Sequence, residues 1–197
     1  MSKISILKKL ALIAAGAMIL PAFAAAEIKM GIILGFTGPI ESLTPDMGSS
    51  AELAFKEASD SGQLLGGQKI SVVRADSTCI DAAAASAAAE RLITSDKVAG
   101  IMGADCSGVT TAIANNVAVP NGVTMISPSA TSPALSTIAD NGYFFRTAPS
   151  DARQGQVLAE ISMERGISQV AVTFTNNDYG KGLSEAFINA YKGLGGK

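Results

Sequence analysis

The chain has 197 residues, of which 48% are hydrophobic and 16% are charged, and its formal net charge is −2. This length and composition suffice to bury a core, in one domain or slightly more. Basic residues form no cluster, so nucleic acids and anionic membranes are poor partners. The sequence has no histidine, which excludes a Ser-His-Asp catalytic triad.

Residues 1–26 differ from the rest of the chain. Three lysines precede an apolar run over residues 10–20, and residues 21–26 supply small side chains at A-x-A spacing. This pattern predicts a secretory signal peptide, with a retained membrane anchor as the alternative. The apolar run is too short to span a bilayer. Without these residues the 15 basic residues fall to 12 against 17 acidic ones, a net charge of −5.

Hydrophobic periodicity predicts strands that alternate with helices along the chain. The expected strands cover residues 28–34, 69–75, 98–102, 124–127, 143–146 and 169–174. The expected helices cover residues 51–61, 82–93, 109–117, 152–165 and 182–194, with Asp81 and Asp151 as predicted N-caps. Such alternation predicts a parallel sheet with helices on both faces. We expect the chain to be the front part of a longer, two-lobed protein, because a sheet of this size cannot close its own edge.

The turn after the third expected strand carries Asp105, Cys106 and Ser107. A helix that starts there exposes unpaired N–H groups and the positive end of its dipole, and the Ser107 hydroxyl adds a donor. These features predict a site for a carboxylate or a similar anion. The alternative is that Ser107 only caps the helix. Asp105 and Asp178 stand beside loops and are expected to face water.

Cys79 and Cys106 are the two cysteines of the sequence. An even pair in an exported protein favours a disulfide. The alternatives are a metal site and a catalytic thiol. Two thiols without histidine make a poor metal site, and a cysteine nucleophile would lack its usual base. We therefore expect neither a metal ion nor a cofactor.

Short motifs along the chain fall in the order and spacing of a known family. They are Gly38-Pro39, the turn ending in Cys79, and residues 103–107, 126–133, 145–151 and 177–182. From Glu27 to its end the sequence resembles the periplasmic leucine/isoleucine/valine-binding proteins, the type I solute-binding components of branched-chain amino acid ABC transporters.

The resemblance implies a fold and a division into domains. The fold class is α/β, a type I periplasmic-binding-protein fold with two Rossmann-like parallel-sheet lobes, the second truncated in this chain. The expected domains are a signal peptide (1–26), an N-terminal ligand-binding lobe (27–146), a hinge segment (147–150) and the start of the second lobe (151–197).

The resemblance also implies residue roles. Ser107 and Thr131 would donate hydrogen bonds to a ligand α-carboxylate, and the backbone carbonyl of Ser129 would accept from the α-ammonium. Tyr179 would cover the ligand from the second lobe, and the family disulfide would pair Cys79 with Cys106. Without the resemblance, Thr131 would form only a local hydroxyl turn and Tyr179 would be a core residue at a helix start.

The predicted function is that of a periplasmic solute-binding protein, which captures an amino acid or a related small polar ligand for an ABC permease. The full-length protein is expected to be a monomer. The alternatives are a ligand-sensing receptor or regulator of the same fold and an α/β enzyme, although the sequence lacks G-x-G-x-x-G, P-loop and G-x-S-x-G motifs. Residues 41–48 make the first loop longer than in the leucine-binding proteins and lack their aromatic residue before the glycine, which leaves the ligand side chain open.

Overall fold

Five parallel strands form one sheet in the computed structural model, which describes residues 27–197; the predicted signal peptide lies outside these residues. The strands are β1 (Ile28–Leu34), β2 (Ile70–Asp76), β3 (Gly100–Gly103), β4 (Thr124–Ser127) and β5 (Phe144–Arg146). Their order is β2-β1-β3-β4-β5, and every neighbouring pair is parallel. The predicted parallel α/β sheet is therefore confirmed.

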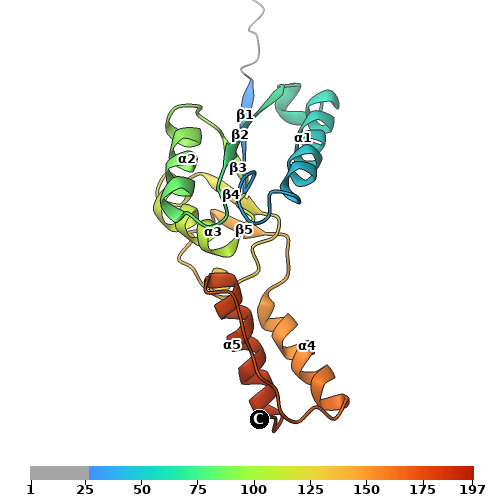
Figure 1. Cartoon of the computed structure of the whole chain (residues 1–197). Helices are drawn as coiled ribbons and strands as arrows, with labels where there is room; N and C mark the ends of the chain where they lie inside the picture. The colour runs from blue at the N-terminus through green and yellow to red at the C-terminus, as the bar shows by residue number, and fades with distance from the viewer. Residues whose placement is uncertain (1–26) are drawn as a thin grey trace, which may run out of the picture.

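Helices connect these strands and follow the last one. They are α1 (Thr44–Asp60), α2 (Ala82–Thr94), α3 (Ser107–Ile113), α4 (Asp151–Glu164) and α5 (Asp178–Gly193). A π-helical segment, Ala114–Ala118, extends α3, and short 3-10 helices cover Leu64–Gly66 and Pro133–Ser136. Figure 1 shows α1 on one face of the sheet, α2 and α3 on the other, and α4 and α5 below it.

The core lies mainly between the sheet and the α2–α3 layer. In α2, Ala85, Ala89 and Leu92 recur at helical spacing and are fully buried. The small alanine side chains let this helix approach the sheet closely. A Cβ atom on Gly31 of β1 would lie 3.0 Å from Cδ1 of Leu92. The alanine-rich run is therefore a packing surface and not a low-complexity tail.

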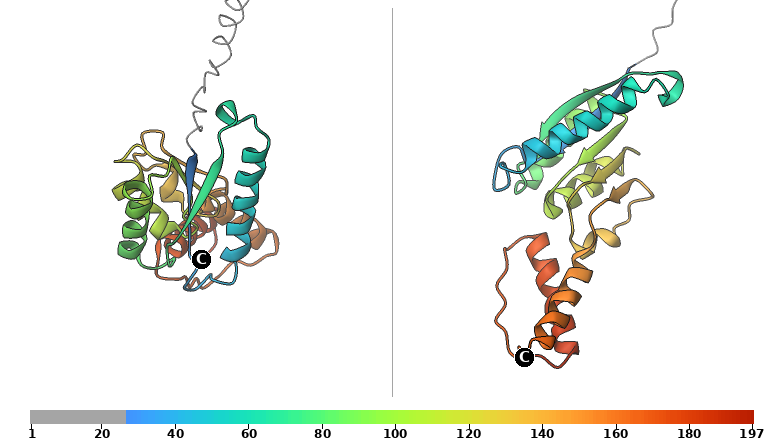
Figure 2. Two further views of the ribbon diagram at one scale, coloured as in Figure 1. Left: turned by 90° about the horizontal axis from the view of Figure 1, so that it is seen from above. Right: turned by 90° about the vertical axis from the view of Figure 1, so that its right-hand side faces the viewer.

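The opposite face of the sheet is covered only in part. Helix α1 packs on β1 and β2, as the side view in Figure 2 also shows. Ile126 of β4 and its register partner Phe145 of β5 stay exposed. Within the described residues, helices thus cover the α2–α3 face of the sheet more completely than the other face, where α1 packs along one side.

Several helix starts differ from the predictions, two of them because of local side-chain capping. Asp81 caps α2 as predicted, with its Oδ1 accepting from the N–H groups of Ala83 and Ala84. Ser150 and not Asp151 caps α4, since the Ser150 Oγ accepts from the Ala152 N–H at 3.2 Å. Helix α5 starts before residue 182, because the Asn177 side chain caps it. Helix α1 starts at residue 44 and not at 51, with a proline in its first turn.

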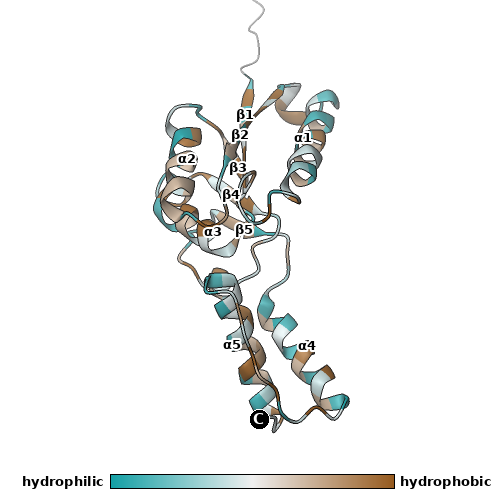
Figure 3. Cartoon of the chain, viewed as in Figure 1, coloured by the Kyte–Doolittle hydropathy of each residue, from teal (hydrophilic) through white to brown (hydrophobic). Residues whose placement is uncertain are grey.

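The predicted strand over residues 169–174 is wrong in this structure. A strand needs a neighbour for its backbone hydrogen bonds, and none lies beside this segment within residues 27–197. Its backbone pairs only with the last residue, through Val170 N–H to the Lys197 carbonyl and Lys197 N–H to the Ser168 carbonyl, both at 2.9 Å. Helices α4 and α5 pack on each other and carry both polar and apolar residues (Figure 3).

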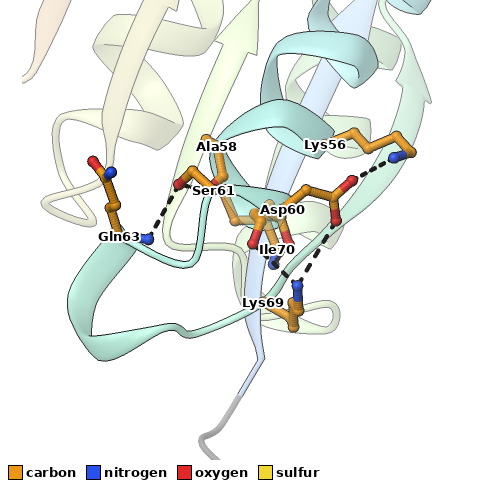
Figure 4. A network of polar contacts seen from close by, with 8 residues as sticks. Lys56, Ala58, Asp60, Ser61, Gln63, Lys69 and Ile70 are labelled. Atoms are coloured by element: carbon orange, nitrogen blue, oxygen red, sulfur yellow. Dashed lines mark hydrogen bonds and ion pairs between the residues drawn. The ribbon is translucent and has the colours of Figure 1, made fainter.

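A polar network joins the end of α1 to the start of β2 (Figure 4). The Ser59 Oγ accepts from the Ile70 N–H, and the Ser59 carbonyl accepts from Lys69 Nζ, both at 3.1 Å. Asp60 forms ion pairs with Lys56 and Lys69. These ion pairs are solvent-exposed and contribute little to stability, so the contacts of Ser59 fix the turn.

A disulfide joins Cys79 to Cys106, as predicted, with a Cα–Cα distance of 5.2 Å. The bond connects the turn after β2 to the residue before α3, across 27 positions of sequence. It therefore fixes the loop that holds Ser107 to the neighbouring strand connection.

Truncation of the core should destabilise the fold. We expect Leu92→Ala to lower the free energy of unfolding by about 2–5 kcal/mol, because it removes a fully buried side chain. Leu53→Ala, on the exposed side of α1, is the matched control and should change it by less than about 0.5 kcal/mol. Urea unfolding followed by circular dichroism measures both. Equal effects of the two substitutions would contradict this packing.

The disulfide should stabilise the folded protein. We expect mass spectrometry of the non-reduced, alkylated protein to find no free thiol, and reduction to lower the free energy of unfolding by about 3–4 kcal/mol through the released loop. A double Cys79→Ser/Cys106→Ser variant is the control, since reductant should not change its stability. Two alkylated cysteines without reduction would exclude the bond.

Candidate ligand-binding site

Asp105 lies where the loops after several strands converge. It is only 3% exposed, so the expectation that it faces water is wrong. Its carboxylate accepts hydrogen bonds from Gly35 N–H at 2.8 Å, Ser77 Oγ at 3.3 Å and Cys106 N–H at 2.9 Å. These donors come from the loops after β1, β2 and β3 and replace the hydration of the charge. Asp105 thus organises the carboxyl edge of the sheet.

Asp76, at the end of β2, holds the loop after β1 at a second point. Its carboxylate accepts from the Thr37 N–H and hydroxyl and from the Thr78 N–H. Burial raises the pKa of Asp76, but these hydrogen bonds outweigh burial, so its pKa lies below the ordinary value. The first loop is therefore anchored at two points. Sequence reasoning missed Asp76, although an acidic residue at a strand end was a visible signal.

Ser107 is the first residue of α3 and is only 2% exposed. Cys106 occupies the N-cap position, so Ser107 is not the helix cap of the alternative interpretation. The Ser107 Oγ accepts from the Ser132 N–H at 3.1 Å, which joins the loop after β3 to the loop after β4. Within residues 27–197 its hydroxyl proton is donated to no acceptor, so the proton is available to a ligand.

Ser129 joins the same two loops from the other side. Its Oγ donates to the Asp105 backbone carbonyl at 3.1 Å. The side chain therefore has a structural partner. Its own backbone carbonyl accepts no hydrogen bond from the described part of the chain, which keeps that oxygen available as an acceptor.

Thr131 is half-buried and directs its hydroxyl to Asp151 at the start of α4. Its Oγ1 donates to Asp151 Oδ2 at 2.8 Å, and the Asp151 N–H donates to the Thr131 carbonyl at 2.9 Å. The partner is 20 residues away, so Thr131 does not form the local hydroxyl turn. A hydroxyl has one proton and two lone pairs. With its proton donated to Asp151, the Thr131 oxygen keeps free lone pairs, and the donor role that the resemblance implies for Thr131 stays a prediction.

Tyr179 lies in the first turn of α5 and is 42% exposed, so it is not a core residue. That turn adjoins the loops of the site. A Cβ atom on Gly182 would lie 3.1 Å from Ser132 Oγ, and one on Gly108 would lie 3.9 Å from the carboxyl carbon of Asp178. The structure therefore brings the start of α5 beside the loops of Ser107 and Thr131. Asp178 is exposed, as expected.

Two hollows lie next to this edge. One, of about 520 Å³, lies between the 3-10 helix Pro133–Ser136 and helices α4 and α5, and Asp178, Lys181 and Glu185 line it. The other, of about 580 Å³ and mainly apolar, lies between α1 and the open face of β3 and β4. None of the predicted ligand residues (Ser107, Ser129, Thr131, Tyr179) lines either hollow.

Neither a metal site nor a membrane-spanning helix is found within the described residues. No group of histidine, cysteine, aspartate or glutamate side chains within residues 27–197 is arranged to hold a metal ion. Among the same residues, no helix combines the length and the apolar character that crossing a membrane requires.

Comparisons with known proteins agree with the observed fold. Residues 27–197 match the family described as periplasmic binding protein. The chain is 33% identical over 163 residues to Leu/Ile/Val-binding protein homolog 3 of Brucella melitensis, covering 82% of this chain and 43% of the relative. It is 29% identical over 171 residues to the Leu/Ile/Val-binding protein of Escherichia coli K12, covering 85% and 45%.

A solved structure gives the same result. The branched-chain amino acid transporter substrate-binding protein LivJ of Streptococcus pneumoniae, solved in complex with isoleucine, superposes with a TM-score of 0.75 at 30% identity, covering 85% of this chain and 47% of that one. The chain spans less than half the length of these relatives. They are binding proteins and not enzymes, in agreement with the prediction from the sequence. The chain belongs to the periplasmic binding protein family, and its relatives include the leucine/isoleucine/valine-binding proteins.

Proposed function

We propose that the complete protein is a periplasmic solute-binding component of an ABC transporter, which captures an α-amino acid between two lobes and delivers it to a membrane permease. In this proposal residues 1–26 direct export, residues 27–146 form the first lobe, residues 147–150 form a hinge, and residues 151–197 begin the second lobe. The full-length protein acts as a monomer and needs no cofactor. Family membership and the names of the relatives support this assignment.

The observation that carries the amino-acid assignment is the opposite polarity of two hydroxyls. Ser107 accepts from the Ser132 N–H and keeps its proton for a ligand carboxylate. Thr131 donates to Asp151 and keeps its lone pairs for a ligand ammonium. The Ser129 carbonyl adds a second acceptor for the ammonium.

A donor and two acceptors on neighbouring loops match the carboxylate and ammonium of an α-amino acid better than they match a simple carboxylic acid. Because Ser107 is buried, a carboxylate held there is shielded from water, which strengthens the hydrogen bond. In the proposal Tyr179 covers the ligand from the second lobe. The first loop, anchored by Asp76 and Asp105, forms the wall next to the ligand side chain.

Ligand-induced stabilisation tests the function. We expect branched-chain amino acids to raise the melting temperature of the full-length protein, since a ligand at 100 times its Kd stabilises the folded state by about 2.7 kcal/mol. Differential scanning calorimetry with L-leucine, L-isoleucine, L-valine, amides, urea and benzoate provides the comparison. A shift with benzoate and none with any amino acid would contradict the assignment.

Removal of either hydroxyl should weaken binding. We expect Ser107→Ala and Thr131→Ala each to cost about 1–3 kcal/mol of binding free energy, because each leaves a charged ligand group without its partner. Isothermal titration calorimetry with the strongest amino acid of the panel measures the loss. Thr94→Ala, which removes an exposed hydroxyl on α2, is the control and should bind normally. Normal binding by both site variants would remove these residues from the site.

A further inference from the structure

Gly182 lies where α5 contacts the loop after β4. It is half-buried in the interior of α5, one turn after Tyr179. A Cβ atom on Gly182 would lie 2.8 Å from Pro133 Cδ and 3.1 Å from Ser132 Oγ. The preferred separation of two non-bonded carbon atoms is about 3.5–4.0 Å. Helix α5 can therefore lie this close to Ser132 and Pro133 only because residue 182 has no side chain.

No backbone requirement explains this glycine. The backbone of Gly182 is helical, and alanine is favoured over glycine inside a helix because glycine loses more conformational freedom on folding. Gly193 ends the same helix, and a Cβ atom there would meet no neighbouring group within 4 Å. Gly182 thus serves a close contact, whereas the space beside Gly193 is open.

The loop that Gly182 contacts is held in place by other elements. The Ser132 N–H donates to Ser107 Oγ at 3.1 Å, and the Ser132 carbonyl accepts from Arg146 Nη1 at 2.8 Å. Pro133 Cδ belongs to a ring that cannot rotate away from the contact. A larger residue at position 182 would therefore displace the start of α5 or break the hydrogen bond between Ser132 and Ser107.

This contact connects the two predicted sides of the ligand site. Ser107 starts α3 at the carboxyl edge of the sheet, and Tyr179 lies in the first turn of α5. Helix α5 contacts α3 and the 3-10 helix Pro133–Ser136. Figure 1 shows α5 starting beside the sheet and running away from it toward the C-terminus. The distance between Ser107 and Tyr179 thus depends on how closely α5 packs on Ser132.

We infer that Gly182 is a positioning residue: by lacking a side chain, it lets α5 pack on Ser132 and Pro133 and thereby sets the separation between Ser107 and Tyr179. This inference rests on the proposed amino-acid function, in which these two residues lie on opposite sides of the ligand. It adds a residue that controls affinity without touching the ligand. A methyl group at position 182 widens the site, and the ligand then loses contacts on one side.

Gly182→Ala tests this role in the full-length protein. Isothermal titration calorimetry with L-leucine, L-isoleucine and L-valine measures the Kd of each amino acid. We expect the substitution to raise the Kd by about tenfold, because it overfills a close contact. Gly193→Ala is the matched control: it adds the same methyl group to the same helix in open space and should leave the Kd unchanged.

A compensating variant separates the contact from general damage to the fold. Pro133→Ala removes the ring carbon that a side chain at position 182 would contact first. Adding Pro133→Ala to Gly182→Ala should recover most of the lost affinity, because the two residues share one contact. Thermal unfolding followed by circular dichroism is the second readout. The unliganded Gly182→Ala protein should melt close to the wild type, since alanine favours the helix.

Three outcomes would overturn this inference alone, provided that the wild type binds one of the three amino acids. They are an unchanged Kd in Gly182→Ala, an equal loss of affinity in Gly193→Ala, and a loss that Pro133→Ala does not restore. A melting temperature that falls together with the affinity would assign Gly182 a purely structural role and would also overturn it. A wild-type protein that binds none of the three would overturn the proposed amino-acid function as well.

Discussion

One buried carboxylate fixes the edge on which the candidate site is built. Parallel strands all end at the same edge, so the loops that follow them meet there with unpaired backbone groups. Asp105 satisfies donors from three of these loops, and its backbone carbonyl accepts from Ser129 in a fourth. The Cys79–Cys106 disulfide adds a covalent link beside it. A loop set held this way is preorganised, and less entropy is lost when a ligand binds.

Hydrogen-bond polarity distinguishes two hydroxyls at this edge of the sheet. Ser107 and Thr131 have the same functional group, yet their protein partners differ. Ser107 accepts a hydrogen bond from a backbone N–H, which leaves the Ser107 hydroxyl proton free. Thr131 instead donates its hydroxyl proton to the carboxylate of Asp151. In the proposed function, these two similar hydroxyls serve opposite ends of a zwitterion. The chemistry of the site depends on these partners as much as on the two residues that would touch a ligand.

Residues 151–197 form α4, α5 and an unpaired extended segment. The two helices approach closely at Gly155, where a Cβ atom would lie 2.5 Å from the Phe187 nitrogen. This packing orders them although residues 169–174 have no partner strand. Ile126 and Phe145 also remain exposed on the five-stranded sheet. The chain spans less than half the length of its relatives, and no described residue covers these faces.

The sequence by itself determined the parallel α/β sheet, the family, the disulfide and the cap of α2, because periodicity, cysteine pairing and capping are encoded in nearby residues or in motif order. Only the tertiary structure decided that Asp105 is buried, that Ser107 bonds to Ser132, and that Thr131 donates to Asp151. Those contacts join residues 70, 25 and 20 positions apart, and no local pattern reports which distant donor meets a given acceptor. The strand predicted over residues 169–174 is absent for the same reason. Apolar alternation predicts a strand, but a strand exists only where the fold places another strand beside it.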